Sequence, residues 1–168
     1  MPVTPEKIKE HLVICEILSC HDDDGGSGDP NLKVVGGRLW VYDNIRNKWI
    51  SADRLQAVAG RKGRCKNAYL RVQDGQAINL TGYRVPRKAI ITAIAAQTRN
   101  NETWTLRVRK NGDSTDIASL VMNNVTGGHD TTVDVDLDEG DQIQIYAETT
   151  AFFGIKDPFA WIEIGWRE

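Results

Sequence analysis

Residues 103–120, TWTLRVRKNGDSTDIASL, decide the fold of this chain. Apolar and polar residues alternate before the turn, with Trp104, Leu106 and Val108 on one face and Thr105, Arg107 and Arg109 on the other. Such alternation is typical of a half-buried antiparallel strand, which packs one face on a core and exposes the other to water. Asn111-Gly112 is a turn signal, and residues 116–122 form the next strand candidate. The stretch therefore predicts two strands joined by a tight turn.

Similar strand candidates continue on both sides of this stretch. Separated by turn signals such as Asp74-Gly75 and Glu139-Gly140, they cover residues 68–73, 76–80, 89–98, 103–110, 116–122, 131–137, 142–149 and 159–166. Many short strands without a long helical pattern between them favour an all-β protein over an α/β enzyme. We expect an antiparallel β-sandwich of jelly-roll type.

The chain divides into three parts by composition. Residues 1–35 form an N-terminal arm, either a short helix or a strand, that ends in the acidic, glycine-rich hinge HDDDGGSGDPN. Residues 36–60 are expected to form a β-hairpin, because the aromatic-rich runs 39–42 and 48–50 flank a polar turn. Residues 61–168 then form the jelly-roll domain.

Charge is strongly segregated along the sequence. Residues 61–110 contain twelve Lys and Arg against two acids, a net charge of +10, whereas residues 111–168 contain two cations against twelve acids, a net charge of −10. The two regions can face each other within one subunit or across a subunit interface. A nucleic-acid-binding protein more often carries basic charge without opposing acids, so we expect no nucleic-acid partner.

Neither a membrane span nor a signal peptide is expected. No apolar run approaches the ~18 residues that a spanning helix needs. The N-terminal segment has acids scattered through it and lacks the apolar core of a secretory signal. The sequence thus predicts synthesis in the cytoplasm and no membrane partner.

Catalytic and metal-binding patterns are weak. His129 beside Asp130 is better explained as a turn than as part of a catalytic triad, because triads are not assembled from sequence neighbours. Asp22, Asp24 and Asp29 have some of the spacing of a calcium loop but lack its closing glutamate. Cysteines and a histidine suited to zinc are too scattered for the usual spacing (Cys15, Cys20, His21 and Cys65). We therefore expect a protein that is not an enzyme, with no cofactor and no metal.

The basic stretch RKGRCK, residues 61–66, contains Cys65 among four cations. In an exposed loop these cations would stabilise a thiolate and lower the pKa of Cys65. Such a thiol could form a disulfide with Cys15 or Cys20 of a neighbouring chain. The alternative, a free thiol in a solvated basic loop, stays open because cytosolic thiols are normally reduced.

The last strand candidate has two apolar faces. Phe159 and Trp161 occupy one face, and the other is formed by Ala160, Ile162, Ile164 and Trp166. Bulky aromatic residues are enriched in the cores of interfaces. This strand is therefore the expected subunit contact, through Phe159, Trp161, Ile162, Ile164 and Trp166. The alternative is that the N-terminal hairpin covers the second face.

Three stretches together resemble a known group of domains: residues 103–120, residues 133–148 (VDVDLDEGDQIQIYAE) and residues 158–166 (PFAWIEIGW). They are similar to the jelly-roll heads of complement-type globular domains, tumour-necrosis-factor-like trimers and bacterial collagen-like proteins, and to accessory virion proteins of tailed bacteriophages. The resemblance covers residues 36–168. It implies a homotrimer that serves as a fibre, a collar or baseplate appendage, or a capsid decoration, anchored in the virion by its N-terminal arm.

A carbohydrate-binding, lectin-like role in host recognition is the alternative function. It would place aromatic residues of the hairpin in contact with a host surface glycan, namely Trp40, Tyr42 and Trp49. A hairpin that packs on the core would instead bury these rings.

Overall fold

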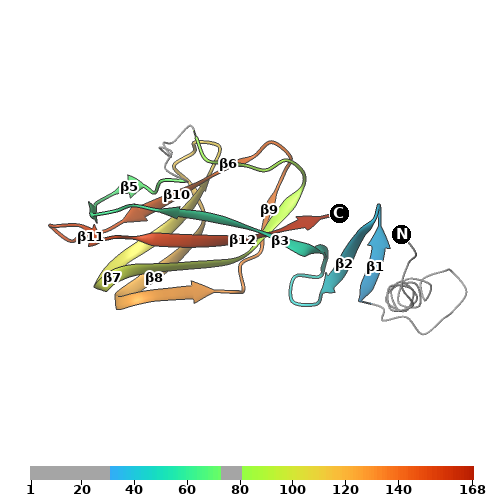
Figure 1. The fold of residues 1–168 in the computed structure, drawn as a ribbon, viewed down its shortest axis with the longest axis horizontal. Helices are drawn as coiled ribbons and strands as arrows, with labels where there is room; N and C mark the ends of the chain where they lie inside the picture. The colour runs from blue at the N-terminus through green and yellow to red at the C-terminus, as the bar shows by residue number, and fades with distance from the viewer. Residues whose placement is uncertain (1–30, 73–80) are drawn as a thin grey trace, which may run out of the picture. The chain divides into compact units, whose positions relative to one another are not determined.

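The computed structural model describes residues 31–72 and 81–168 and is all-β over that range (Figure 1). The chain divides at Ala52/Asp53 into two compact units. The expected arm at residues 1–30 and the strand candidate at 76–80 lie outside the described residues. No helix in the described ranges is long and apolar enough to cross a membrane.

The first unit is an antiparallel meander that confirms the expected hairpin. It contains β1 (Leu32–Val35), β2 (Arg38–Asp43) and the beginning of β3 (Lys48–Gly60). The turn between β2 and β3 forms because the carboxylate of Asp43 accepts hydrogen bonds from the backbone N–H groups of Ile45 and Arg46, at 2.9 and 3.1 Å. β1 was not among the expected strands. It pairs with β2 along its full length.

The second unit contains the remainder of β3 and all later strands. Its main sheet has the order β3-β12-β7-β10-β5, with β8 and β9 also paired to β7 and β6 paired to β10, while β4 and β11 form a separate two-stranded sheet. These strands are β4 (Arg64–Cys65), β5 (Ala68–Tyr69), β6 (Tyr83–Arg84), β7 (Ala89–Lys110), β8 (Asp116–Asp130), β9 (Val135–Leu137), β10 (Gln142–Glu148), β11 (Ile155–Lys156) and β12 (Phe159–Arg167).

One long strand, β7, joins two halves of the main sheet. Residues 89–97 pair with β12, and residues 105–110 pair with β10. Between them, the pairing of β7 with β8 becomes irregular from Gln97 to Glu102. The sequence predicted two strands here, at 89–98 and 103–110. The structure instead places both in a single strand that changes partner at the irregular segment, so that the two halves can pack on each other as a β-sandwich.

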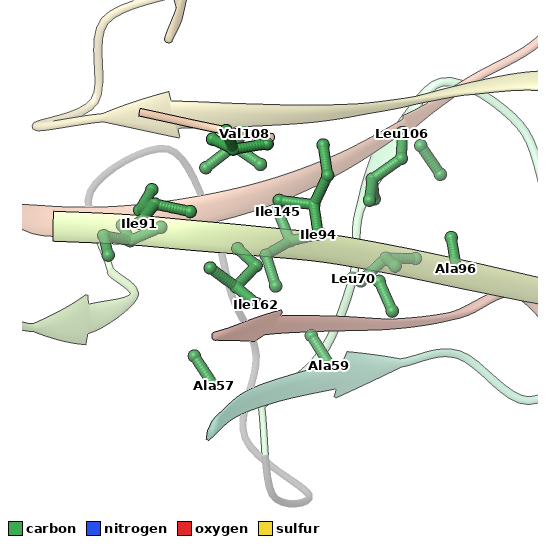
Figure 2. Packing of buried hydrophobic residues seen from close by; sticks show 14 of the residues in the cluster. Ala57, Ala59, Leu70, Ile91, Ile94, Ala96, Leu106, Val108, Ile145 and Ile162 are labelled. Carbon is green, nitrogen blue, oxygen red and sulfur yellow. The ribbon is translucent and has the colours of Figure 1, made fainter. Parts of the chain in front are cut away.

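The core is formed by the inward-facing residues of both halves. Ile94 of β7 and Ile162 of β12 lie beside Ile145 of β10 in the interior (Figure 2), and each is at most 1% exposed. Trp104, Leu106 and Val108 are also buried, which confirms the alternation expected for residues 103–109. Each such side chain stabilises the fold by about 1.5–3 kcal/mol when it leaves water. The jelly-roll order of connections remains a prediction.

The turn between β7 and β8 is hydrogen-bonded to the turn that precedes β10. Asn111 and Gly112, between β7 and β8, both have positive φ, which a type I′ turn requires and which Asn and Gly adopt readily. The Asn111 side-chain amide donates to Oδ1 of Asp141 at 2.7 Å, and its carbonyl oxygen accepts from the N–H of Gln142 at 2.8 Å. Asp141 thereby links the turn after β7 to the start of β10.

Asp141 has further partners that favour its ionised form. Its Oδ2 accepts from the N–H of Asp138 at 2.8 Å and lies 3.2 Å from the Lys110 ammonium. Burial alone would raise the pKa of Asp141, but the hydrogen bonds from Asn111 and Asp138 and the charge of Lys110 lower it below the usual value. The carboxylate therefore stabilises the folded state only while it is charged.

Asp141→Ala should lower the free energy of unfolding by about 1–3 kcal/mol, because buried N–H groups lose a charged acceptor. A depressed folded-state pKa also means that this stabilisation is complete above the unfolded value of about 3.9 and is lost as the pH falls through the folded-state value. Denaturant titrations of wild type, Asp141→Ala and Asp141→Asn between neutral and acidic pH would measure both effects. Glu139→Ala, at an exposed neighbouring position, is the control, and an equal loss in that variant would contradict the assignment.

Candidate functional site: the outer face of strand β12

The outer surface of β12 carries two aromatic rings on a sheet of small residues. Trp161 lies opposite Ala95 of β7, which in turn lies opposite His129 of β8. Phe159 lies opposite Gln97 of β7 in the same way. Because opposed residues in antiparallel strands share a face, these side chains all lie on one surface. We call this surface, defined by Phe159, Trp161, Gly60, Ala95 and Gly127, the aromatic face.

The two rings of the aromatic face contact each other and the neighbouring strand. Phe159 and Trp161 pack edge to face with ring centroids 4.5 Å apart, and both side chains are half-buried. A Cβ atom added at Gly60 would lie 2.6 Å from Cδ2 of Phe159. Glycine at position 60 is therefore what allows the Phe159 ring to lie against β3.

Hollows flank the two rings. One of about 640 Å³ is bordered by Trp161, Ala95, Gly127, Gly128 and His129, together with Ala96, Gln97, Thr98, Arg99 and Thr126. A second, of about 480 Å³, is bordered by Phe159 and by the 60–63 and 156–158 segments, with Arg99. The face is thus an uneven surface with aromatic side chains between two concave regions, which suits contact with another macromolecule.

Charges of both signs surround the aromatic face. Arg54 lies 3.6 Å from Glu163, and Arg99 lies 3.8 Å from Asp157. Arg61 and Lys62 border the second hollow as well. A rim of mixed charge around an apolar centre is the usual arrangement of a protein–protein contact surface.

Within the chain, the basic and acidic regions of the sequence face each other. Arg107 pairs with Asp116 and Glu148, Arg109 lies 3.1 Å from Asp116, and Lys110 lies 3.2 Å from Asp141. Arg99 and Asp157 add a further pair between the two regions. Of the two arrangements that the sequence left open, pairing within a subunit is therefore observed.

Three of the residues expected at the subunit contact do not lie on the aromatic face. Ile162 and Ile164 are at most 1% exposed and belong to the core, and Trp166 packs against that core and beneath the guanidinium of Arg87, 5.0 Å from the ring centroid. The placement of Ile162 and Ile164 in a contact was wrong, because the core on that side of β12 is closed by the strands of the opposite half. Phe159 and Trp161 remain available.

Cys65 is buried, contrary to the expectation of an exposed loop. It is 2% exposed and belongs to the core cluster, because β4 pairs with β11 and places Cys65 opposite Ile155. Burial raises the pKa of the Cys65 thiol, and the nearby Arg61 only partly opposes this shift. The lowered pKa inferred from the surrounding cations was therefore wrong. A buried, protonated Cys65 does not support the expected disulfide with a neighbouring chain. Cys15 and Cys20 lie outside the described residues.

The hairpin aromatics are divided between the interior and the surface of the first unit. Trp40 is 8% exposed, and its indole N–H donates to the carbonyl of Val35 at 3.4 Å. Tyr42 and Trp49 are half-buried and pack edge to face, with centroids 5.3 Å apart. The ammonium of Lys33 lies 4.3 Å from the centroid of Trp49 and occupies one face of that ring. Trp40 is thus unavailable to a glycan, whereas Tyr42 and Trp49 keep accessible edges.

Neither the described side chains nor the comparisons with known proteins assign a catalytic site to this chain. His129 is exposed, and the carboxylate of Asp130 beside it accepts two hydrogen bonds from Thr132, at 2.8 and 2.7 Å. Among residues 31–72 and 81–168, no group of three or more His, Cys, Asp or Glu side chains could hold a metal ion. No family model matches the chain, and no curated protein matches it.

The sequence reasoning missed one exposed feature, the adjacent phenylalanines at positions 152 and 153. They are 83% and 71% exposed, and Phe152 has the largest value among the described large apolar side chains. Their signal in the sequence was the segment AFFG, in which two apolar residues precede a glycine at the end of β10, where a turn is expected.

Gly60→Ala should displace the Phe159 ring and lower the free energy of unfolding by about 1 kcal/mol or more, because the added methyl group overlaps the ring. Gly128→Ala is the matched control, since a Cβ there would have no neighbour closer than 4.0 Å. Thermal unfolding measures stability, and near-ultraviolet circular dichroism reports the Phe159–Trp161 contact. Equal behaviour of the two variants would show that Gly60 does not position this ring.

Cys65 should be unreactive toward a water-soluble thiol reagent in the folded protein. The measurement is a thiol titration of the Cys15→Ser/Cys20→Ser variant, which leaves Cys65 as its single thiol. We expect complete reaction in denaturant and little reaction under native conditions near neutral pH, because the thiol is both buried and protonated. Fast native modification would mean that the β4–β11 region opens readily.

Proposed function

We propose that this protein is a non-enzymatic structural subunit of a bacteriophage virion that assembles as a homotrimer through its aromatic face. The single observation that supports assembly most directly is the Phe159–Trp161 pair on the outer face of β12, half-buried and flanked by hollows. Aromatic residues of this kind commonly supply most of the binding energy in protein interfaces. The virion assignment is supported by the resemblance of residues 36–168 to accessory proteins of tailed phages.

A second copy of the chain is the occupant that best fits the aromatic face. The rim contains Arg54 and Glu163 at one side and Arg99 and Asp157 at another, so a copy of the same surface region offers charges of both signs in return. The hollow beside Trp161, bordered by Ala95 and Gly127, leaves room for inserted side chains of the second copy. A trimer arranged around these faces would place β12, a central strand of each sheet, near the symmetry axis.

The proposed subunit would serve as a rigid part rather than as a catalyst. Its sandwich core is continuous from β12 to β10, and its exposed turns are fixed by side-chain hydrogen bonds such as those of Asn111 and Asp141. In this proposal the arm at residues 1–35 anchors the subunit to another virion protein.

Glycan binding is the second candidate, supported by the accessible edges of Tyr42 and Trp49. It ranks below assembly because Lys33 covers one face of Trp49, and a sugar ring stacks on such a face. Binding of the isolated protein to a glycan array, lost in Trp49→Ala, would favour this second function.

Native mass spectrometry at micromolar concentration should give three times the 18.8-kDa chain. Phe159→Ser/Trp161→Ser should give monomers, since it removes the aromatic centre of the contact. Val121→Ser is the control, because Val121 is an apolar residue 70% exposed on β8 and not on the aromatic face. A monomeric wild type would contradict the proposal.

A second variant keeps the test valid if the double substitution reduces folding. Ala95→Lys places a long charged side chain in the outer hollow, which has room for it, and leaves the core unchanged. We expect a folded monomer with the wild-type circular dichroism spectrum. A trimer that tolerates this lysine would show that the subunits meet through another surface.

A further inference from the structure

The exposed phenylalanines occupy the apex of a hydrogen-bonded turn. The N–H of Gly154 donates to the carbonyl of Ala151 at 3.1 Å, so Phe152 and Phe153 are the two central residues of a β-turn between β10 and β11. Their rings meet edge to face, with centroids 5.0 Å apart. Turn apices usually carry Gly, Asn, Asp, Ser or Pro, because the apex faces water. Two adjacent phenylalanines at such a position indicate an apolar binding partner.

The backbone beneath this turn is firmly held. Gly154 has a φ of +71°, and a Cβ atom there would lie 2.4 Å from the carbonyl oxygen of Cys65, so only glycine fits. Arg64 Nη1 donates to the carbonyl of Gly154 at 3.1 Å, and Ile155 is fully buried opposite Cys65. Both rings are therefore presented to solvent by a fixed support.

Basic side chains surround the two rings. The guanidinium carbon of Arg64 lies 5.8 Å from the centroid of Phe153, and the ammonium of Lys66 lies 6.0 Å from the centroid of Phe152. We call these four residues, Phe152, Phe153, Arg64 and Lys66, the phenylalanine tip. Arg61, Lys62 and Lys156 add positive charge in the paired 61–66 and 154–158 segments.

Two acids that contact the 61–66 and 154–158 segments are already engaged. Asp157 accepts from the N–H of Gly63 at 2.5 Å and pairs with Arg99, and Glu102 accepts from the N–H of Lys156 at 2.7 Å. The cations of residues 61–66 and Lys156 therefore gather at this end of the second unit.

The tip lies at the end of the second unit that is opposite the entry of the chain. β3 enters this unit at Asp53 and ends at Gly60, about 25 Å away at the usual rise of an extended strand. The segment after Gly60 is bonded to the base of the tip, since Arg61 N–H donates to the carbonyl of Pro158. Figure 1 shows β11 at this same end of the unit.

We propose that the phenylalanine tip binds the surface of an anionic lipid bilayer. Phe152 and Phe153 insert at the boundary between headgroups and acyl chains, and Arg64 and Lys66 contact lipid phosphates. Apolar insertion together with flanking cations is one way in which peripheral proteins attach to anionic membranes. Phenylalanine has no polar group with which to hydrogen-bond a sugar, so a glycan fits the tip less well. The proposal is independent of trimer formation.

The test is flotation of the full chain with vesicles of phosphatidylcholine alone or mixed with phosphatidylglycerol. Binding is expected only to the mixed vesicles, and it should weaken at high salt. Phe152→Ala/Phe153→Ala should reduce the partition coefficient at least about tenfold, because the buried apolar area is lost. Lys66→Gln should reduce it by a smaller factor.

Ile45→Ala is the matched control, because Ile45 is 77% exposed in a turn of the first unit where Arg46 is paired with Asp43. The substituted side chains of Phe152, Phe153, Lys66 and Ile45 are all exposed. The variants should therefore keep the wild-type unfolding midpoint and the wild-type mass. Absence of flotation with either vesicle overturns the proposal, as does binding that survives the double alanine substitution. Loss of the oligomer in that variant would identify the tip as a subunit contact and also overturn it.

Discussion

The interlock between Asn111 and Asp141 is the interaction on which the arrangement of the sandwich depends. One turn joins β7 to β8, and a second turn precedes β10. The two turns are distant in sequence. Asn111 bonds to Asp141 and to the backbone of Gln142, and thereby fixes the register at which β10 meets the second half of β7. With that register set, Ile143, Ile145 and Ala147 all face the core, whereas a slip by one residue would turn them to solvent.

The sequence allowed the strands to be predicted well where one face is apolar and the other polar. Residues 103–110 and 142–148 are of this kind, and the structure buries the apolar face of both. In the second strand it also buries Gln144, which the alternation placed on the polar face. It did not allow the join between 89–98 and 103–110 to be predicted, because the polar segment QTRNNE between them has the composition of a turn. There the chain continues as strand because β8 pairs along both parts of β7. Such tertiary pairing overrides a local turn preference.

The candidate site could be predicted only in part from the sequence. Alternation correctly placed Phe159 and Trp161 on one face of β12, but it could not reveal which face the rest of the chain covers. The burial of Ile162 and Ile164 depends on β7 and β10, and that of Cys65 depends on the pairing of β4 with β11. Both are contacts between segments far apart in the sequence. Local charge around Cys65 was a poor guide to its pKa, because desolvation outweighs the effect of Arg61.

Two aromatic pairs of the second unit, Phe159–Trp161 and Phe152–Phe153, differ in a way that argues for different partners. Phe159 and Trp161 are half-buried, they lie on the face of the sheet, and Gly60 fits closely against Phe159. A rigid surface with defined hollows favours a partner of complementary shape, such as a folded protein. Phe152 and Phe153 project from a narrow turn and are mostly exposed. Such a projecting apex suits a partner that deforms around inserted rings, as the interfacial region of a bilayer does.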